Sequence, residues 1–163
     1  MPDMTESSNG TAISHENSED EKQLIFSLMN RFYSFPSHYI GEIALFDTVY
    51  PLPLMPPYIL GVINRYSIPY ALFDIGLLFH NTPSPRGKVL IIKDDIDRIA
   101  FLIDDVMGIT GIQQEKLLNV ERNAGSNDLT EAVQSSFSWN GSDVFILDIK
   151  KILSHVKEDI GPQ

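Results

Sequence analysis

The chain has 163 residues, a formal net charge of −10 and a sequence pI near 4.6. This acidity excludes nucleic acid as an expected partner, because phosphate binding relies on Lys and Arg. Because the sequence has no cysteine, no signal-peptide pattern at its start and no apolar run of the roughly 18 residues that span a bilayer, we expect a cytoplasmic protein without disulfides or direct membrane insertion.

The N-terminal part of the chain divides into a polar tail and the first expected strands. Residues 1–21 are mostly Ser, Asn, Asp and Glu, a composition that cannot offset its ordering entropy, so we predict a disordered acidic tail. Residues 24–29 and 32–35 are predicted strands of a hairpin that turns at Asn30-Arg31. A third extended segment is expected over residues 39–45.

Proline and glycine shape the next segment. Pro57 suits the first turn of a short helix through Leu60, which Gly61 would end. Residues 62–73 then form an expected hairpin around Arg65-Tyr66-Ser67. Four prolines before it predict a stiff extended connection, since each fixes φ and removes a backbone donor; they are Pro51, Pro53, Pro56 and Pro57.

The second half carries its own hairpin signals. It opens with a predicted hairpin that turns at Asp94-Asp95 and closes with one over residues 133–147. The closing hairpin turns at Asn140-Gly141, a pair that favours two-residue hairpin turns. Between them we predict a short helix at 113–118 and a mobile loop at 119–128.

One local device occurs twice, a strand followed by Asp and a short amphipathic turn, at Phe73-Asp74-Ile75 and at Leu147-Asp148-Ile149. Asp in this position caps the free N–H groups of a helix. The repeat indicates two similar units, residues 22–80 and 88–163, the second ending in a C-terminal helix, with a polar Pro/Gly linker at 81–87. Short strands with turns every 8–12 residues or so predict an all-β fold with a few short helices, built as two small barrels.

The residue inventory does not indicate an active site. The histidines are scattered without metal-ligand spacing, and neither a phosphate-binding glycine loop nor a nucleophile elbow is present. Some aromatic residues could stack on a ligand, but packing across strands is the more frequent role. We therefore expect no catalytic residue, no metal site and no cofactor. The histidines are His15, His38, His80 and His155, and the aromatic residues are Phe32, Tyr33, Phe35 and Trp139.

The segment 88–95 keeps one enzyme-like alternative open. A strand that ends in paired acids is how a response-regulator receiver domain begins, where carboxylates gather Mg²⁺ beside a phosphoacceptor. The chain after this point is short for a receiver and lacks its alternation of strands and helices. A hairpin tip, in which Asp94, Asp95 and Asp97 supply turn chemistry, is the favoured interpretation.

Several segments, taken together and in order, resemble a known family. The densest is Pro56-Pro57-Tyr58-Ile59-Leu60-Gly61-Val62-Ile63-Asn64, with Asp74-Ile75 ten residues after Asn64. This is similar to the pattern of the CheW family, the coupling proteins of bacterial chemotaxis arrays: proline, a short apolar helix, Gly-Val-Ile-Asn, then a strand ending Asp-Leu. The remaining matches are 24–28, Tyr33 and Glu42-Ile43 upstream, and Ile103-Asp104-Asp105-Val106 and 147–153 downstream.

The resemblance implies a pair of SH3-like five-stranded β-barrels packed along a hydrophobic seam. It also implies a non-enzymatic adaptor that bridges the cytoplasmic tips of chemoreceptors to the regulatory domain of a CheA-type histidine kinase. By position, Ile40, Glu42 and Ile43 would face the kinase or a neighbouring CheW-like protein. The resemblance places Gly61, Val62 and Asn64 beside that surface, and Val106 in a groove between the barrels that receives the receptor helix.

The sequence departs from the family at one corner. Where the family continues Asn-Leu-Arg-Gly, this chain has Asn64-Arg65-Tyr66-Ser67, so Tyr66 takes the position of the usual Arg and cannot supply its fork of donors. Arg65 is adjacent, but neighbouring side chains of an extended strand point to opposite faces. We include Arg65 and Tyr66 among the predicted partner-binding residues.

Three functions follow as hypotheses. The first is a CheW-like adaptor that couples chemoreceptors to a histidine kinase. The second is a divergent scaffold for surface motility or another chemosensory pathway, in which the altered corner favours a different partner. The third, from a different class, is an Asp-rich phosphoacceptor resembling a receiver domain.

Overall fold

The structure, a computed structural model, describes residues 22–85, 87–93, 97–113, 116–118 and 132–161. The predicted acidic tail, the turn at Asp94-Asp95 and the loop at 119–128 lie outside these ranges, as does part of the predicted helix at 113–118. No helix in the described ranges is long and apolar enough to cross a membrane.

Strands dominate the described chain, with two α-helices and a short 3-10 helix at Ser37–Tyr39. Each helix directly follows a strand and an Asp residue, as the repeated device predicts. The elements are β1 (Lys22–Leu28), β2 (Arg31–Pro36), β3 (Ile40–Leu45), β4 (Ile59–Arg65), β5 (Ile68–Asp74), α2 (Ile75–His80), β6 (Lys88–Ile92), β7 (Ile99–Ile103), β8 (Asp105–Gly111), β9 (Val133–Trp139), β10 (Ser142–Leu147) and α4 (Ile149–Ile160).

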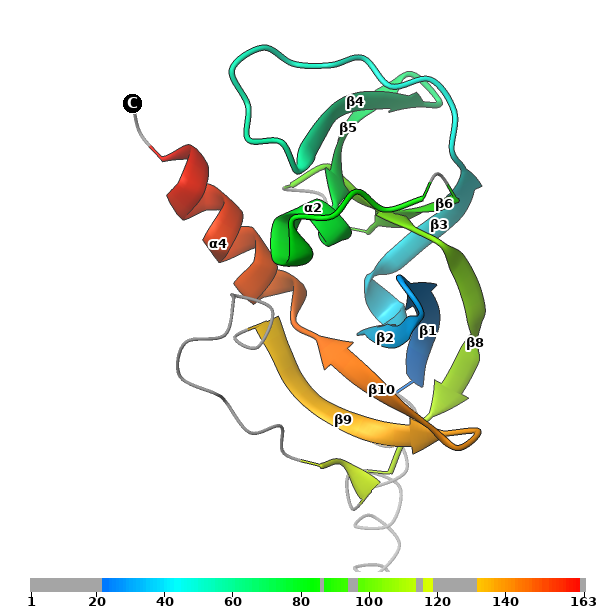
Figure 1. Cartoon of the computed structure of the whole chain (residues 1–163). Helices are drawn as coiled ribbons and strands as arrows, with labels where there is room; N and C mark the ends of the chain where they lie inside the picture. Colours follow the sequence, from blue (N-terminus) through cyan, green and yellow to red (C-terminus); the bar gives the residue numbers. More distant parts are fainter. Residues whose placement is uncertain (1–21, 86, 94–96, 114–115, 119–131, 162–163) are drawn as a thin grey trace, which may run out of the picture.

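The strands form two five-stranded sheets, which confirms the mostly β architecture (Figure 1). Sheet A has the order β8-β1-β2-β10-β9 and sheet B the order β3-β6-β7-β5-β4. In each sheet one inner pair is parallel, β2 with β10 and β5 with β7, and the other pairs are antiparallel. The two sheets therefore share the same pattern of parallel and antiparallel pairs, although the chain passes through their strands in a different order.

Each sheet is built from strands of both the N-terminal and the C-terminal half of the chain. β1 and β2 lie in sheet A while β3 to β5 lie in sheet B, and β6 and β7 lie in sheet B while β8 to β10 return to sheet A. The division predicted at residues 81–87 consequently does not separate the sheets, because each takes strands from both sides of it. The hydrogen bonds between paired strands join backbone groups that every strand carries. The hydrophobic alternation of a strand therefore could not identify the strand with which it pairs.

The SH3-like barrels that the resemblance implies would require each sheet to close on itself. Among the described residues no ladder joins β8 to β9 or β3 to β4, so the pairings define open sheets. Outside the named strands, isolated bridges extend two edges: Tyr50 pairs with Val62 on β4, and Leu118 pairs with Ser136 on β9.

Two local predictions differ from the structure. The short helix predicted through Leu60 is wrong, because Ile59–Arg65 is strand β4. Its buried and exposed residues alternate, and β-branched side chains such as Ile59 and Ile63 suit a pleated surface, so pairing with β5 outweighs the signal from Pro57. Strand β8 (Asp105–Gly111) is absent from the predicted strands.

Three hairpins turn through two residues, each with φ in the left-handed region. Such type I′ turns match the twist of the flanking strands. The predicted turn at Asn140-Gly141 is confirmed, and the first turn lies one residue earlier than predicted. The turn residues are Met29-Asn30, Tyr66-Ser67 and Asn140-Gly141.

A single buried cluster crosses from one sheet to the other and forms the hydrophobic seam. Phe26 and Phe35 of sheet A stack at 5.3 Å between ring centroids, Phe35 stacks on Phe101 of sheet B at 5.3 Å, and Phe101 contacts Phe73 at 6.0 Å. The predicted packing role of the aromatic residues is confirmed, since Tyr33 and Phe35 are buried and Phe32 meets Trp139 edge to face.

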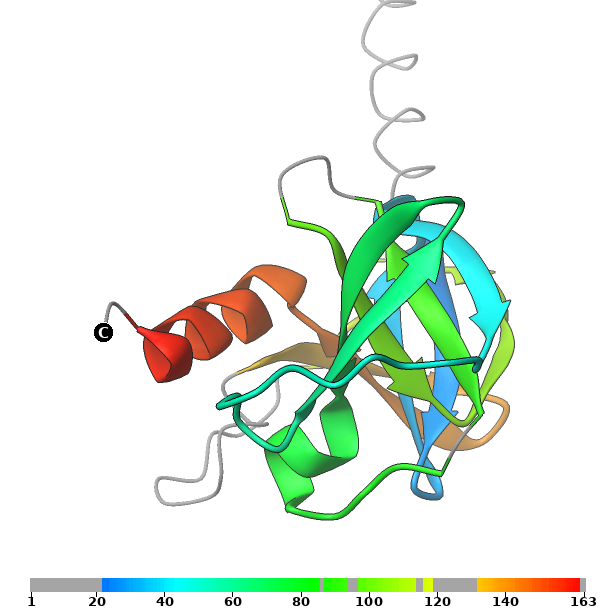
Figure 2. The same cartoon turned by 90° about the horizontal axis from the view of Figure 1, so that it is seen from above.

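Helix α4 follows sheet A in the chain but is tied to sheet B, and Figure 2 shows it lying to one side of the strands. The hydroxyl of Tyr58 donates to Asp159 at 2.7 Å, and Lys157 lies 3.3 Å from Asp97. Burial and the Asp159 carboxylate raise the pKa of Tyr58, so the phenol stays a donor at neutral pH. The helix thereby links the two sheets at their margin.

Candidate partner-binding surfaces

Several of the predicted site residues lie on the two edge strands of sheet B, β3 and β4. β3 and β4 stand at opposite ends of this sheet, yet the guanidinium of Arg65 donates twice to Oε1 of Glu42, once from Nε at 3.0 Å. Both side chains are about one-third exposed. The Arg65 hydrogen bond lowers the pKa of Glu42, so the pair is charged at neutral pH. A partly exposed ion pair thus joins the two edge strands without a backbone ladder.

The side chain of Tyr66 does not lie where strand geometry alone predicts. It belongs to the turn and not to the strand, so the expectation that Arg65 and Tyr66 point to opposite faces is wrong. The Arg65 guanidinium lies 4.8 Å from the centroid of the Tyr66 ring, which is 79% exposed. Carboxylate, guanidinium and phenol therefore form one continuous polar and aromatic surface, which we call the corner (Glu42, Arg65 and Tyr66).

Replacing Ser67 by Gly should stabilise the protein. Ser67 has φ of 64° in the second position of the turn, a region that costs an L-residue with a side chain more than it costs glycine. We expect the free energy of unfolding to rise by about 0.5–1 kcal/mol, measured by urea denaturation. Ser138→Gly, in strand β9, is the matched control and should lower stability; equal effects at both sites would contradict the explanation.

The other predicted residues of sheet B divide between exposed and structural positions. Ile43 is 44% exposed on β3, whereas Ile40 packs against the buried cluster. Gly61 has φ of 141° and lies against the backbone of Tyr50, where a β-carbon would clash. Val62 holds the same backbone through two hydrogen bonds of 2.8 and 2.9 Å with Tyr50. Gly61 and Val62 therefore position the β3–β4 connection.

Asn64 lies on the exposed part of β4 beside the corner. It lines a pocket of about 180 Å³ together with Arg65 and Leu45. Leu45 is 76% exposed and was missed by the sequence analysis, although it follows Ile43 with the two-residue spacing of one strand face. The structure thus brings Asn64, Arg65 and Leu45 together beside β3.

Val106 lies apart from these residues, on β8 of sheet A. It pairs with Phe26 of β1 and packs partly buried against the seam. Its neighbours Met107 and Ile109 are 43% and 61% exposed. These two residues were also missed, because β8 was not recognised as a strand with alternating exposure. The predicted set therefore occupies two separate surfaces, one on each sheet.

The acidic residues near β6 have structural partners. Lys88 lies 2.6 Å from Asp105, and Oδ2 of Asp104 accepts from the backbone of Met29 at 2.9 Å. The receiver-like alternative is contradicted, because β6 and β7 form an antiparallel hairpin where a receiver has parallel strands joined by helices. Within the described ranges, no three His, Asp or Glu side chains gather as metal ligands would.

The comparisons with known proteins agree with this fold. The family model of the CheW-like domain matches residues 22–157, so the chain belongs to the CheW family. The structure is similar to the crystal structure of the scaffolding protein TtCheW from Thermoanaerobacter tengcongensis, with a TM-score of 0.71 and 16% sequence identity over 80% of this chain and 85% of that one. At this identity the similarity concerns the fold. No curated protein matches the chain.

Proposed function

We propose that this protein is a non-catalytic, cytoplasmic adaptor that joins the regulatory domain of a CheA-type histidine kinase to the cytoplasmic tips of chemoreceptors. Two surfaces on one rigid body allow it to hold two partners, so that the state of one biases the other. The SH3-like barrel form of each sheet is part of this proposal.

The proposal rests on the mixed apolar and charged surface at the edge strands of sheet B. Ile43 and Leu45 present exposed apolar side chains on β3, and the corner supplies charged and aromatic groups next to them. Protein interfaces combine an apolar, aromatic and Arg-rich centre with a polar rim. We assign this surface to the kinase or to a neighbouring CheW-like protein.

The second surface lies on sheet A, around Val106. Partial burial against the seam places Val106 next to the junction of the sheets, and Met107 and Ile109 form an exposed apolar strip on the opposite face of β8. An amphipathic helix can lay its apolar face along such a strip. We assign this surface to the receptor helix.

The corner also favours a second candidate. Tyr66 offers a ring and a hydroxyl where the family resemblance places a guanidinium, which alters the hydrogen bonds a partner can make. A partner matched to Tyr66 would differ from an ordinary receptor or kinase, as in a scaffold for surface motility or another chemosensory pathway.

Two single substitutions on β3 should each weaken the kinase contact. Ile43→Asp places a carboxylate in the apolar centre, and Glu42→Ala removes the partner of Arg65, so we expect at least a tenfold loss of affinity, about 1.4 kcal/mol. The measurement is titration calorimetry against a CheA-type regulatory domain. Ile40 is unsuitable for this test, because it also packs against the buried cluster.

Met107→Asp is the control for this experiment, since it introduces the same charge on sheet A. It should leave kinase affinity unchanged and weaken the receptor interaction. If the variants on β3 bind the regulatory domain as the wild type does, the assignment of this surface is wrong.

A further inference from the structure

The connection between β3 and β4 carries an unusually exposed apolar segment. We call residues 50–57 the apolar loop; Figure 1 shows it arching outside β4. No residue from Thr48 to Tyr58 is charged, in a chain of net charge −10. Leu54 is 99% exposed, and the exposed fractions of Leu52 and Met55 are 41% and 40%. Exposed apolar groups gathered in this way are typical of an interaction site.

The apolar loop is anchored by backbone hydrogen bonds at both of its ends. Its base is hydrogen-bonded to β4 through Tyr50 and Val62, and the backbone N–H of Ile59 donates to Pro56 at 3.0 Å. Leu54 has φ of 60°, a region that is unfavourable for a leucine. Anchoring at both ends reduces the entropy that the loop loses when a partner buries its side chains.

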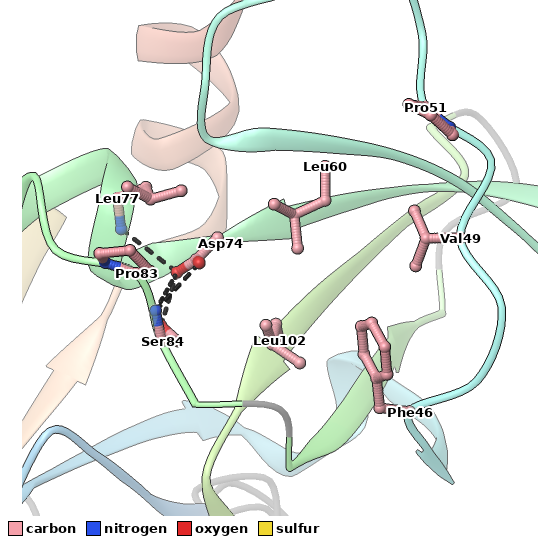
Figure 3. Close-up of a pocket in the computed structure, with 9 residues that line it drawn as sticks. All are labelled: Phe46, Val49, Pro51, Leu60, Asp74, Leu77, Pro83, Ser84 and Leu102. Atoms are coloured by element: carbon pink, nitrogen blue, oxygen red, sulfur yellow. Dashed lines mark hydrogen bonds between the residues drawn. The ribbon is translucent and has the colours of Figure 1, made fainter.

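An open apolar pocket adjoins this loop. It has a volume of about 360 Å³ and is shared between the β3–β4 connection, sheet B and α2 (Figure 3). The two polar side chains in its lining satisfy each other, since the Ser84 hydroxyl donates to Asp74 at 2.5 Å. The apolar lining comprises Phe46, Val49, Leu60, Leu77 and Leu102, and Pro51 belongs to both the pocket and the loop.

We propose that two copies of this chain associate through these features, with Leu54 of each copy entering the pocket of the other. Because Pro51 places loop and pocket side by side, one two-fold axis can form both contacts at once, the self-complementary arrangement of dimers. An apolar cavity of about 150 Å³ accommodates benzene, so this pocket has room for a leucine side chain.

Charge favours a second copy as the occupant. Two molecules of net charge −10 repel each other, and the uncharged stretch from Thr48 to Tyr58 is where they can approach without bringing like charges together. The same surface also supplies both the inserted side chain and the pocket that receives it. Neither Leu54 nor the pocket that receives it belongs to the corner or to β8.

The test is sedimentation velocity of the full chain from about 10 μM to 1 mM, the range in which a contact of a few side chains is measurable. The wild type should shift from monomer to dimer across this range. Leu54→Asp should weaken association at least tenfold, and Asp tolerates the left-handed φ at this position. The control is Leu118→Asp, the same change at a leucine that is 58% exposed beside β9 of sheet A, which should associate as the wild type does.

Leu77→Trp, which fills the pocket, should also be monomeric. When the two variants are mixed, Leu54 of the Leu77→Trp variant can still enter the unfilled pocket of the Leu54→Asp variant. A heterodimer should therefore form through this one contact. Urea denaturation of each variant checks that it is folded. A wild type that stays monomeric to 1 mM overturns the proposal, as does equal association of the Leu54→Asp and Leu118→Asp variants. Loss of kinase binding by Leu54→Asp with a monomeric wild type would assign the loop to the kinase.

Discussion

Asp74→Ala should lower the free energy of unfolding by about 3 kcal/mol or more, because it removes the acceptor for several buried donors at once. Asp74 is 2% exposed. Its carboxylate accepts from the backbone N–H of Leu77 at 3.2 Å, which caps α2, and from the N–H and hydroxyl of Ser84 at 3.0 and 2.5 Å. Urea denaturation of the full chain gives the measurement.

Asp148 provides a matched control within the same molecule. It caps α4 by accepting from the N–H groups of Lys150 and Lys151 at 3.0 and 3.3 Å, but these bonds are solvent-exposed. Water can replace them, so Asp148→Ala should cost only about 1 kcal/mol, the usual value for a helix cap. Equal losses at Asp74 and Asp148 would show that capping alone, and not burial, determines the effect.

These two residues also illustrate what the sequence could predict. Capping is a local interaction between an Asp and the three residues after it, so the repeated pattern identified both caps and both helices. The contact of Asp74 with Ser84 depends on how the chain returns after α2, and no local pattern contains that information. The burial that separates the two caps therefore required the structure.

The same distinction applies to the sheets and the candidate site. Hairpins such as the one at Asn140-Gly141 are local and were predicted, whereas the exchange of strands between the halves depends on contacts distant in sequence. The family resemblance supplied Glu42 and Ile43, but not the ion pair of Glu42 with Arg65, 23 residues away. The prolines around Leu54 predicted a stiff connection. The exposure of Leu54 and the pocket beside it could be found only in the structure.

Strand exchange has a consequence for cooperativity. Because each sheet takes strands from both halves of the chain, the unfolding of either half breaks four of the eight ladders, β1–β8, β2–β10, β3–β6 and β5–β7. The buried cluster shared by the sheets reinforces this coupling. An adaptor of this kind presents its two surfaces from one cooperative body, so strain applied at one sheet reaches the other through packed side chains and not through a flexible linker.

Phe101→Ala tests this coupling across the seam. Phe101 lies on β7 of sheet B, is fully buried and stacks on Phe35 of sheet A at 5.3 Å. Truncating a buried Phe typically costs about 3–5 kcal/mol. Trp139, the only tryptophan in the sequence, lies on β9 and reports on sheet A, while far-UV circular dichroism reports on both sheets. We expect the urea transitions seen by fluorescence and by dichroism to shift together.

Phe32→Ala is the control, since Phe32 is half-buried in a separate cluster and contacts Trp139 edge to face at 6.0 Å. It should cost about 1–2 kcal/mol, less than a fully buried ring because less apolar area is lost. A double-mutant cycle between Phe35 and Phe101 should give a coupling of about 0.5–1.5 kcal/mol. If Phe101→Ala shifts the dichroism transition and leaves that of Trp139 in place, the sheets unfold independently and the seam does not join them into one cooperative unit.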